Sequence, residues 1–338
     1  MAGPTVAVVV TCWNLGAYLP ETIRSIRAQT FTDYEICVVD DGSTDPATLE
    51  VLGRLPADIR RVTTENRGLP AARNAGVRAT SGEYVCAVDA DDILSPSLLE
   101  KSVERLNASP TLAFVSHWLR AFGDESWEWR PAQCDLPGLL DTNPVNGAAL
   151  IRRSVVAAVG GWDETMRDGG EDWEFWIRVV SGGYRGEIIP EVLFEYRRRA
   201  DSMSRIKFAG SGHAAVYRSI IERHPSLFRQ HWPSLAARRE GDMAGYRADT
   251  DRLEELIELE LEPATQRTRD DLDTVRHQAD RADREAALQF EVASLTQAHD
   301  QAVLAIDALR SSWSWRLSYP LRVLGRLALQ LRSHAPRR

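Results

Sequence analysis

The sequence predicts an α/β protein built on a doubly wound, mixed sheet, with a helical region after it. Over residues 5–225, short apolar runs rich in β-branched residues alternate with stretches of helical periodicity. The connections between them are mostly short, which is typical of strands and helices that alternate in a layered sheet. Farther along the chain, apolar residues recur at three- and four-residue spacing, which predicts helices that pack along their length.

Composition narrows the class of protein. The chain has 338 residues, 43% of them hydrophobic, and a formal net charge of -8, which fits a globular protein and argues against a nucleic acid as partner. The four cysteines form no CxxC pair, which favours a reducing compartment. We see no signal peptide at the N-terminus and no apolar stretch long enough to span a bilayer, so we expect a cytoplasmic protein.

Two predicted strands of the first half end in carboxylates. The elements expected here are strands at 6–11, 35–39, 60–64 and 84–88 and helices at 18–29, 45–52 and from about 70. Asp40 and Asp41 follow the second strand, and Asp89 and Asp91 end the fourth. Ligand crevices of open α/β sheets lie outside such strand ends, and clustered carboxylates with room for phosphates suit Mg²⁺ or Mn²⁺. The alternative is a set of turns and helix caps, which we favour for Asp45.

An arginine near a helix N-terminus lies between these two acidic strand ends in the sequence. Gly68 and Pro70 open the helix, and Arg73 follows in its first turns. Alone, Arg73 could be an ordinary surface residue. Together with the acidic strand ends, it describes a crevice with carboxylates for a base, a ribose or a metal and a cation for phosphate.

A second acidic cluster follows an irregular stretch. Further elements are expected at 96–107 (helix), 113–119 (strand), 154–159 (helix), 193–198 (strand) and 214–224 (helix), with Trp118, Trp127 and Trp129 in a loop-rich stretch. Glu171 and Asp172 begin a half-buried helix after a Gly-rich loop. They could simply complement the helix dipole, or one could accept a proton. Arg197 and Arg199 suit phosphate contact or a solvated loop.

These motifs, in this order, resemble inverting glycosyltransferases of family 2, which have the nucleotide-sugar-binding GT-A fold. The resemblance covers about residues 5–225, and its motifs are Val10-Thr11-Cys12-Trp13-Asn14, Val39-Asp40-Asp41-Gly42-Ser43-Thr44-Asp45, Gly68 to Gly76, Asp89-Ala90-Asp91-Asp92, Gly160-Gly161-Trp162-Asp163 and Gly170-Glu171-Asp172. One departure is the segment after the catalytic helix, where many relatives have a histidine and this chain has Tyr196-Arg197-Arg198-Arg199. Arginine replaces that histidine as a phosphate clamp, or the metal is held more loosely.

The resemblance implies a role for each matching position. Asp172 would be the general base with Glu171 beside it, and Asp91 and Asp89 would hold Mg²⁺ or Mn²⁺. The nucleotide sugar, with UDP or dTDP favoured, would be bound by Thr11, Asn14, Asp40, Asp41, Arg73, Asp89, Ala90 and Asp91. The acceptor side would be formed by Gly161, Trp162 and Asp163, and the phosphate clamp by Arg197 and Arg199.

The predicted domains are a GT-A glycosyltransferase domain at 1–235, an acidic helical region at 236–311 and a basic amphipathic tail at 312–338. The helical region reads as a coiled coil that joins copies of the chain into a homo-oligomer, or as a helix packed on the catalytic domain. Trp313, Trp315 and Tyr319 with the arginines of the tail favour an anionic membrane surface, and a partner protein is the alternative.

The sequence therefore predicts an enzyme that moves a sugar from a nucleoside diphosphate onto a lipid-linked or growing bacterial surface glycan, at the inner face of the membrane. A sugar nucleotidyltransferase is disfavoured, because such enzymes carry a Gly-rich basic loop after the first strand, where this chain has Cys12-Trp13-Asn14. A catalytically inactive coiled-coil scaffold is the non-enzymatic alternative.

Overall fold

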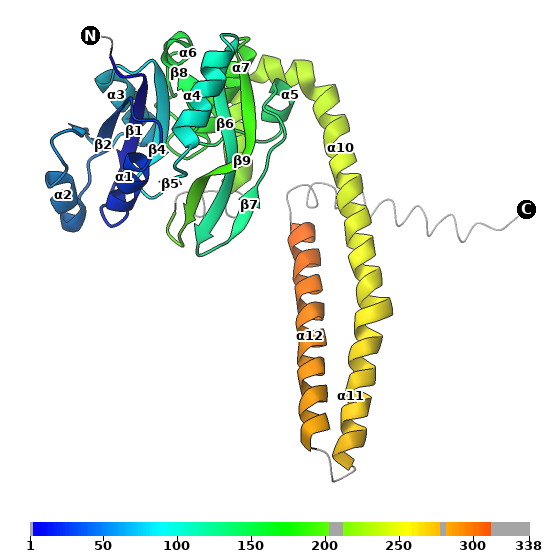
Figure 1. Ribbon diagram of the computed structural model, residues 1–338. Helices are drawn as coiled ribbons and strands as arrows, with labels where there is room; N and C mark the ends of the chain where they lie inside the picture. Colours follow the sequence, from blue (N-terminus) through cyan, green and yellow to red (C-terminus); the bar gives the residue numbers. More distant parts are fainter. Residues whose placement is uncertain (1–2, 203–211, 278–281, 312–338) are drawn as a thin grey trace, which may run out of the picture. The chain divides into compact units, whose positions relative to one another are not determined.

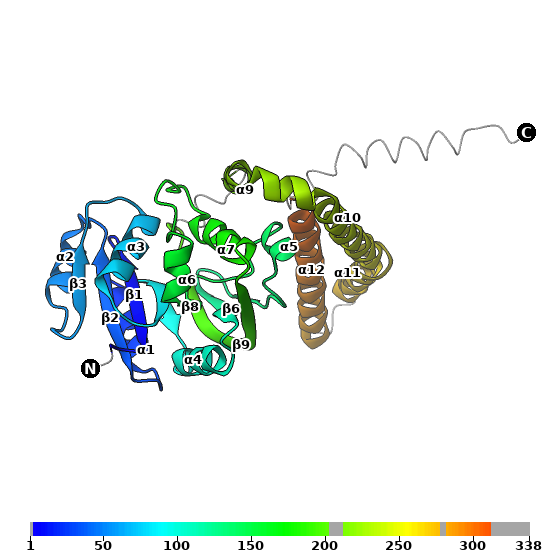
Figure 2. The ribbon, with the colours of Figure 1, turned by 90° about the horizontal axis from the view of Figure 1, so that it is seen from above.

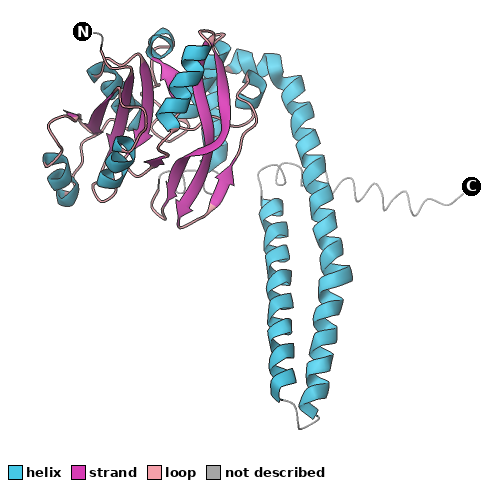
Figure 3. Cartoon of the chain, in the orientation of Figure 1, coloured by secondary structure: helices cyan, strands magenta, loops and turns pink. Residues whose placement is uncertain are grey.

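The computed structural model describes residues 3–202, 212–277 and 282–311 (Figure 1). The chain divides into two compact units, Met1–His231 and Trp232–Arg338, and the division falls within one long helix. The first unit combines strands and helices, whereas the second is helical throughout its described residues (Figure 3).

The first unit contains a nine-stranded mixed sheet, as the sequence predicts. Its strands are β1 (Val6–Cys12), β2 (Tyr34–Asp40), β3 (Arg60–Thr63), β4 (Tyr84–Asp89), β5 (Ile93–Leu94), β6 (Leu112–Gly123), β7 (Trp127–Trp129), β8 (Leu150–Arg152) and β9 (Arg185–Arg198). The order is β3-β2-β1-β4-β8-β6-β9-β5, with β7 paired to β6. The strands from β3 to β4 run parallel, β8 is antiparallel to β4 and β6, and β9 is parallel to β6.

Helices cover both faces of this sheet (Figure 2). The helices of the first unit, besides the start of the long helix, are α1 (Leu19–Arg27), α2 (Pro46–Gly53), α3 (Leu69–Ala79), α4 (Leu98–Ala108), α5 (Leu136–Leu139), α6 (Arg153–Ala158), α7 (Glu171–Ser181) and α9 (Gly212–Arg223). All seven residues of β1 are buried, which explains why its sequence shows no polar alternation. Asp45 accepts a hydrogen bond from the Thr48 amide at 2.9 Å and so caps α2, as predicted.

Two strands extend well beyond the apolar runs that the sequence displays. β9 runs over fourteen residues and β6 over twelve, whereas the sequence predicts strands at 193–198 and 113–119 only. The added part of β9 carries Glu187 and Glu191, which form ion pairs with α4, and it also carries Pro190. Charged residues on a solvent-facing side interrupt an apolar run without interrupting the strand, so the prediction is too short.

The second unit is built from α10 (Pro225–Leu256), a π-helical turn η1 (Ile257–Leu261), α11 (Glu262–His277) and α12 (Ala282–Ser311). α12 lies beside α11 and η1 within the same chain (Figure 1). Pro263 is the second residue of α11, where its missing N–H is tolerated. A coiled coil between copies stays a prediction, and the amphipathic tail at 312–338 lies outside the described residues. Of the helices described, none is both long and apolar enough to cross a membrane.

Candidate active site

The carboxyl ends of β1 and β4 form the floor of the site. Thr11 and Asp89 are register partners in the two parallel strands, and the Thr11 hydroxyl donates to Asp89 Oδ1 at 2.9 Å. The Ala90 amide donates to the Thr11 carbonyl at 3.0 Å, and the Ala90 carbonyl accepts from the Thr22 hydroxyl at 2.8 Å. The chain therefore turns away from β4 in a fixed conformation, directly after Asp89.

Arg73, from α3, connects this floor to the start of α7. Its Nη1 donates to Glu171 Oε1 at 2.7 Å, and its Nη2 lies 3.4 Å from Asp89 Oδ1. The side chains of Arg73 and Glu171 are each 5% exposed. Burial lowers the pKa of Arg73, but Asp89 and Glu171 raise it by more, so the guanidinium stays charged. Its Nε is buried and has no hydrogen-bond partner among the described residues.

Glu171 and Asp172 begin α7, directly after Gly170, whose φ of 78° is left-handed. Burial, and after it the charge of Asp172, raise the pKa of Glu171 to about 7, although Arg73 opposes the shift. Burial also raises the pKa of Asp172 above its ordinary value. Asp172 Oδ2 accepts a hydrogen bond from Asn143 Nδ2 at 3.1 Å. Sequence analysis missed Asn143, which stands alone in a loop; only its position in an Asn-Pro-Val-Asn-Gly turn could have drawn attention to it.

Arg197 of β9 and Arg199, just after β9, lie against the acidic end of β4. Arg199 Nε lies 3.1 Å from Asp91 Oδ2, and the Arg197 amide donates to Asp92 Oδ1 at 2.9 Å. Burial raises the pKa of Asp91 to about 6; Asp89 adds to the shift and Arg199 opposes it. Of the two arginines predicted to clamp phosphate, Arg199 is thus held by the Asp91 carboxylate, whereas the Arg197 guanidinium pairs with Glu21 and donates to the Asp91 carbonyl at 2.9 Å.

Three of the residues predicted to bind the nucleotide build loops. Asn14 Oδ1 accepts the amides of Thr44 and Asp45 at 2.8 and 2.9 Å. Asp40 accepts the Ser43 amide at 2.9 Å, and Asp41 accepts the Gly68 amide at 2.8 Å. These bonds shape the turns at the ends of β1, β2 and β3. Contact with a ligand stays a prediction for all three.

A cleft of about 390 Å³ lies between the start of α7 and the strands β6, β7 and β9. Its polar lining consists of Arg73, Asp89, Asp92, Thr142, Asn143, Asn146, Glu171, Asp172 and His213. Its larger apolar side chains are Leu119, Trp127, Trp129, Trp173, Phe194 and Tyr196. The cleft therefore joins the acidic strand end, the buried arginine and both acids of α7, which the sequence places far apart.

Comparison with known proteins gives a family match for part of the chain. Residues 7–160 match the model of glycosyl transferase family 2. This part of the chain is a family 2 glycosyltransferase domain. An uncharacterized glycosyltransferase of Methanocaldococcus jannaschii is 27% identical to the chain over 223 residues, which are 61% of this chain and 76% of that protein.

Two solved structures share the GT-A-like fold of the family 2 domain. S. aureus TarS 1-349 in complex with UDP-GlcNAc matches with a TM-score of 0.53 and 19% identity, over 59% of this chain and 60% of that one. The mannosyltransferase PcManGT from Pyrobaculum calidifontis, in complex with GDP-Man and Mn²⁺, matches with a TM-score of 0.53 and 19% identity, over 92% and 88%. At these identities, the likeness concerns the fold alone.

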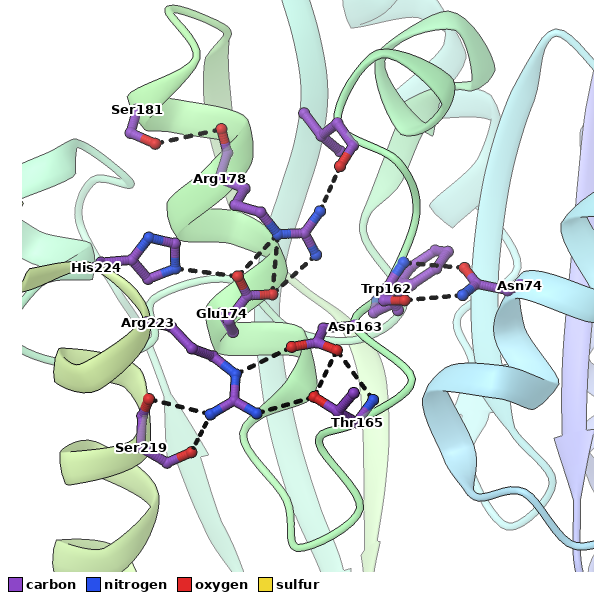
Figure 4. A network of polar contacts seen from close by, with 11 residues as sticks. Asn74, Trp162, Asp163, Thr165, Glu174, Arg178, Ser181, Ser219, Arg223 and His224 are labelled. Atoms are coloured by element: carbon purple, nitrogen blue, oxygen red, sulfur yellow. Dashed lines mark hydrogen bonds and ion pairs between the residues drawn. The ribbon is translucent and has the colours of Figure 1, made fainter.

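The predicted acceptor loop at 161–163 does not line the cleft. Gly161, Trp162 and Asp163 line a separate pocket of about 370 Å³ instead. Trp162 is 5% exposed, and its ring stacks on Phe175 with centroids 4.4 Å apart. Asn74 binds the backbone of Trp162 through both ends of its amide, at 2.8 and 2.9 Å (Figure 4).

A polar network fixes this second pocket (Figure 4). Asp163 Oδ2 accepts from Arg223 Nε of α9 at 3.0 Å. Glu174, on α7 and 3% exposed, accepts from Arg178 at 2.8 Å and lies 3.0 Å from His224 Nε2. Burial raises the pKa of Glu174, but the hydrogen bonds from His224 and Arg178 outweigh burial, and the pKa is lowered. The network thus ties α7 to α9 with its charges satisfied internally.

The residues at the acidic strand end fit a divalent cation by their chemistry. Among residues the structure describes, no group of three or more His, Cys, Asp or Glu side chains is arranged to hold a metal by itself. Asp89 and Asp91 offer carboxylate oxygens, the ligands of Mg²⁺ and Mn²⁺, and their mutual repulsion contributes to the raised pKa of Asp91. Two carboxylates suit a metal that takes its other ligands from phosphate and water.

Proposed function

We propose that the chain is an inverting glycosyltransferase in which Asp172 is the general base. The observation that carries this proposal is that Asp172 lines the same cleft as Asp89 and Arg73. Asn143 holds Oδ2 of Asp172, while Oδ1 accepts the Trp173 amide at 2.7 Å. A carboxylate held at both oxygens keeps one orientation, which a base needs in order to meet an incoming hydroxyl.

In the proposed reaction, Asp172 accepts the proton of the acceptor hydroxyl. The acceptor oxygen forms a bond to the anomeric carbon while the bond from that carbon to the diphosphate oxygen breaks, and the nucleoside diphosphate leaves. The raised pKa of Asp172 makes it a stronger base than an exposed aspartate. Because one displacement occurs, the anomeric configuration inverts.

Arg73 and Glu171 act on the donor side of this step. Glu171 fixes one end of the guanidinium, and Asp89 contacts the other. The buried N–H group at Nε of Arg73 can donate a hydrogen bond, and a diphosphate oxygen would accept it. A divalent cation held by Asp91 and Asp89 would supply positive charge to the leaving diphosphate.

For the donor and the acceptor, we propose a chemical class. UDP or dTDP is favoured as donor nucleotide, supported by UDP-GlcNAc in the S. aureus structure, whereas the P. calidifontis structure contains GDP-Man. The acceptor is a lipid-linked or growing surface glycan at the cytoplasmic face of a membrane, to which the basic tail at 312–338 would bind. The exposed apolar side chains Leu259, Phe290 and Leu304 of the second unit support self-association of the chain.

Calorimetric titration of the full chain with UDP, dTDP, GDP and CDP tests this function. Each is titrated with Mn²⁺ and again with EDTA, on the wild type, Asp91→Ala and Asp58→Ala. Asp58 is an exposed aspartate paired with Arg27, and so it controls for the loss of one charge. We expect one nucleotide to bind with metal only, in the wild type and Asp58→Ala but not in Asp91→Ala. No binding of any nucleotide would favour the inactive scaffold instead.

A further inference from the structure

One face of the sheet beside the cleft carries an ordered set of aromatic rings. β6 pairs with β7 on one side and with β9 on the other. Leu119 of β6 is the register partner of Trp129 and of Phe194, and all three side chains line the cleft. This first row is packed against the hydrophobic core.

The next row along the same three strands has a small residue in its middle. Ala121 is the register partner of Trp127 on β7 and of Tyr196 on β9. Ala121 is fully buried and small, whereas Trp127 is 42% exposed, and both aromatic residues line the cleft. We name Trp127, Ala121 and Tyr196 the aromatic trough, because a ring stands on each side of a methyl group.

The opposite face of these strands is charged. Arg120 lies 3.0 Å from Glu128 and 3.9 Å from Glu195, and Arg130 also pairs with Glu128. Side chains alternate between the two faces of a strand, so these pairs fix which face Trp127 and Trp129 present. The hairpin therefore turns its aromatic face to the cleft and keeps its charges outside.

The rings of the aromatic trough are held in place. Glu125 Oε2 accepts from the indole Nε1 of Trp127 at 3.3 Å and from Arg198 Nε at 3.1 Å. The Arg198 guanidinium lies 5.8 Å from the centre of the Tyr196 ring. Glu125 and Arg198 thus connect Trp127 to Tyr196 across the aromatic trough.

We propose that the aromatic trough binds the sugar ring of the acceptor that carries the attacking hydroxyl. This inference rests on the proposed function and adds the acceptor subsite to it. A pyranose presents C–H groups on one face, which pack on the electron-rich face of an aromatic ring, and hydroxyls at its edge. Thr142, Asn143 and Asp172 line the same cleft and offer partners for those hydroxyls. A lipid chain would leave these polar groups unpaired, and the loops of Asn14, Asp40 and Asp41, predicted to bind the nucleotide, contribute no lining residue to this cleft.

The first test is binding without any nucleotide. The full chain is labelled with 5-fluorotryptophan, and Trp127→Phe and Trp129→Phe assign the two resonances in ¹⁹F spectra. The probes are the methyl glycosides of glucose, galactose, N-acetylglucosamine and mannose, with farnesyl phosphate and UDP as competing classes of occupant. We expect a glycoside to shift the Trp127 resonance. The control is Trp232 of α10, which is 58% exposed but does not line the cleft, so its resonance should stay unchanged.

Two variants remove the aromatic trough in different ways. Trp127→Ala removes one ring, and Ala121→Leu places a larger side chain at the buried position between the two rings, which must move to accommodate it. Each variant should weaken glycoside binding at least tenfold, while Trp232→Phe should not change it. Circular dichroism and UDP titration check that each variant folds, and Trp127→Ala truncates an exposed side chain, so it stays interpretable if Ala121→Leu unfolds. A Trp127 shift caused by farnesyl phosphate or UDP only, or by no probe, overturns the subsite.

The two proposals fail in different ways. If a glycoside binds in the aromatic trough but no nucleotide binds with Mn²⁺, the transferase activity is rejected while the sugar site stands. If a nucleotide binds with metal but no glycoside reaches Trp127, the acceptor subsite alone is rejected.

Discussion

Arg73 and Glu171 form an ion pair of 2.7 Å between side chains that are each 5% exposed, although 98 residues separate them. The pair joins α3 to the first turn of α7, where Asp172 follows directly. Asp89 shares the same guanidinium at 3.4 Å. The carboxylates of Asp89 and Glu171 therefore share one buried arginine, whose charge also acts on Asp172, so α3, the end of β4 and the start of α7 are fixed together.

Replacing Arg73 by methionine should destabilise the protein strongly. The loss leaves Glu171 buried and unpaired, which typically costs about 3–5 kcal/mol. Urea unfolding measures the change in the free energy of unfolding. Arg78→Met is the matched control on the same helix, because Arg78 is 62% exposed and its pair with Glu164 is long, at 3.8 Å; it should cost less than about 0.5 kcal/mol. Equal losses in both variants would contradict a structural role for the Arg73 pair.

Stability should depend on pH through Glu171. Its pKa in the folded protein is raised from 4.5 to about 7, chiefly by burial, so between these values the folded state holds a proton that the unfolded state has lost. Its contribution is therefore largest below pH 4.5 and is lost as the pH rises towards and through 7. Glu171→Gln should remove this part of the pH dependence, as urea unfolding at several pH values between 5 and 8 would reveal. An unchanged slope in the variant would refute the assignment.

Gly170→Ala should disturb the packing of α9 on the start of α7. A Cβ at this position would lie 2.3 Å from Val216 Cγ1, and the residue has a φ of +78°. Gly160→Ala is the matched control, since its φ of +81° imposes similar strain but nothing lies within 4 Å of its Cβ. We expect about 1 kcal/mol of destabilisation for Gly160→Ala and about 1–3 kcal/mol more for Gly170→Ala. Thermal unfolding measures both, and Val216→Ala should partly rescue Gly170→Ala; without rescue, the contact is not the cause.

Asp163→Asn tests whether Asp163 contacts the acceptor, as the resemblance implies, or stabilises the fold through Arg223. The structure places Asp163 on Arg223 of α9, outside the cleft of Asp172. We expect a loss of about 1 kcal/mol in unfolding free energy with turnover within about twofold of the wild type. A large fall in turnover at unchanged stability would return Asp163 to the acceptor side, as the sequence suggests.

The sequence predicts the elements whose residues are buried on both faces. β1 and β4 are continuous apolar runs, and the acids at the end of β4 do meet Arg73 and the start of α7 in one place. The cap by Asp45 is also confirmed, because an N-cap depends on residues that are neighbours in sequence.

Features that depend on distant pairing are not visible in the sequence. The role of Asn143 arises only when its loop meets α7, and Trp127 and Tyr196 become neighbours of Ala121 only through strand register. The resemblance assigns Trp162 to the acceptor side, and the structure buries its ring against Phe175. These are tertiary consequences that local patterns do not encode.

The most direct test of the account is the turnover of Asp172→Asn on the donor that calorimetry identifies. Slow hydrolysis of that donor needs no acceptor, since water takes the place of the hydroxyl, and Asp58→Asn serves as control. We expect hydrolysis to fall by about 10²–10⁴-fold, with nucleotide affinity within about twofold of the wild type and an inverted anomer as the first product of the wild type. Retained hydrolysis in Asp172→Asn, or loss of nucleotide binding instead, would contradict the assignment of Asp172 as the base.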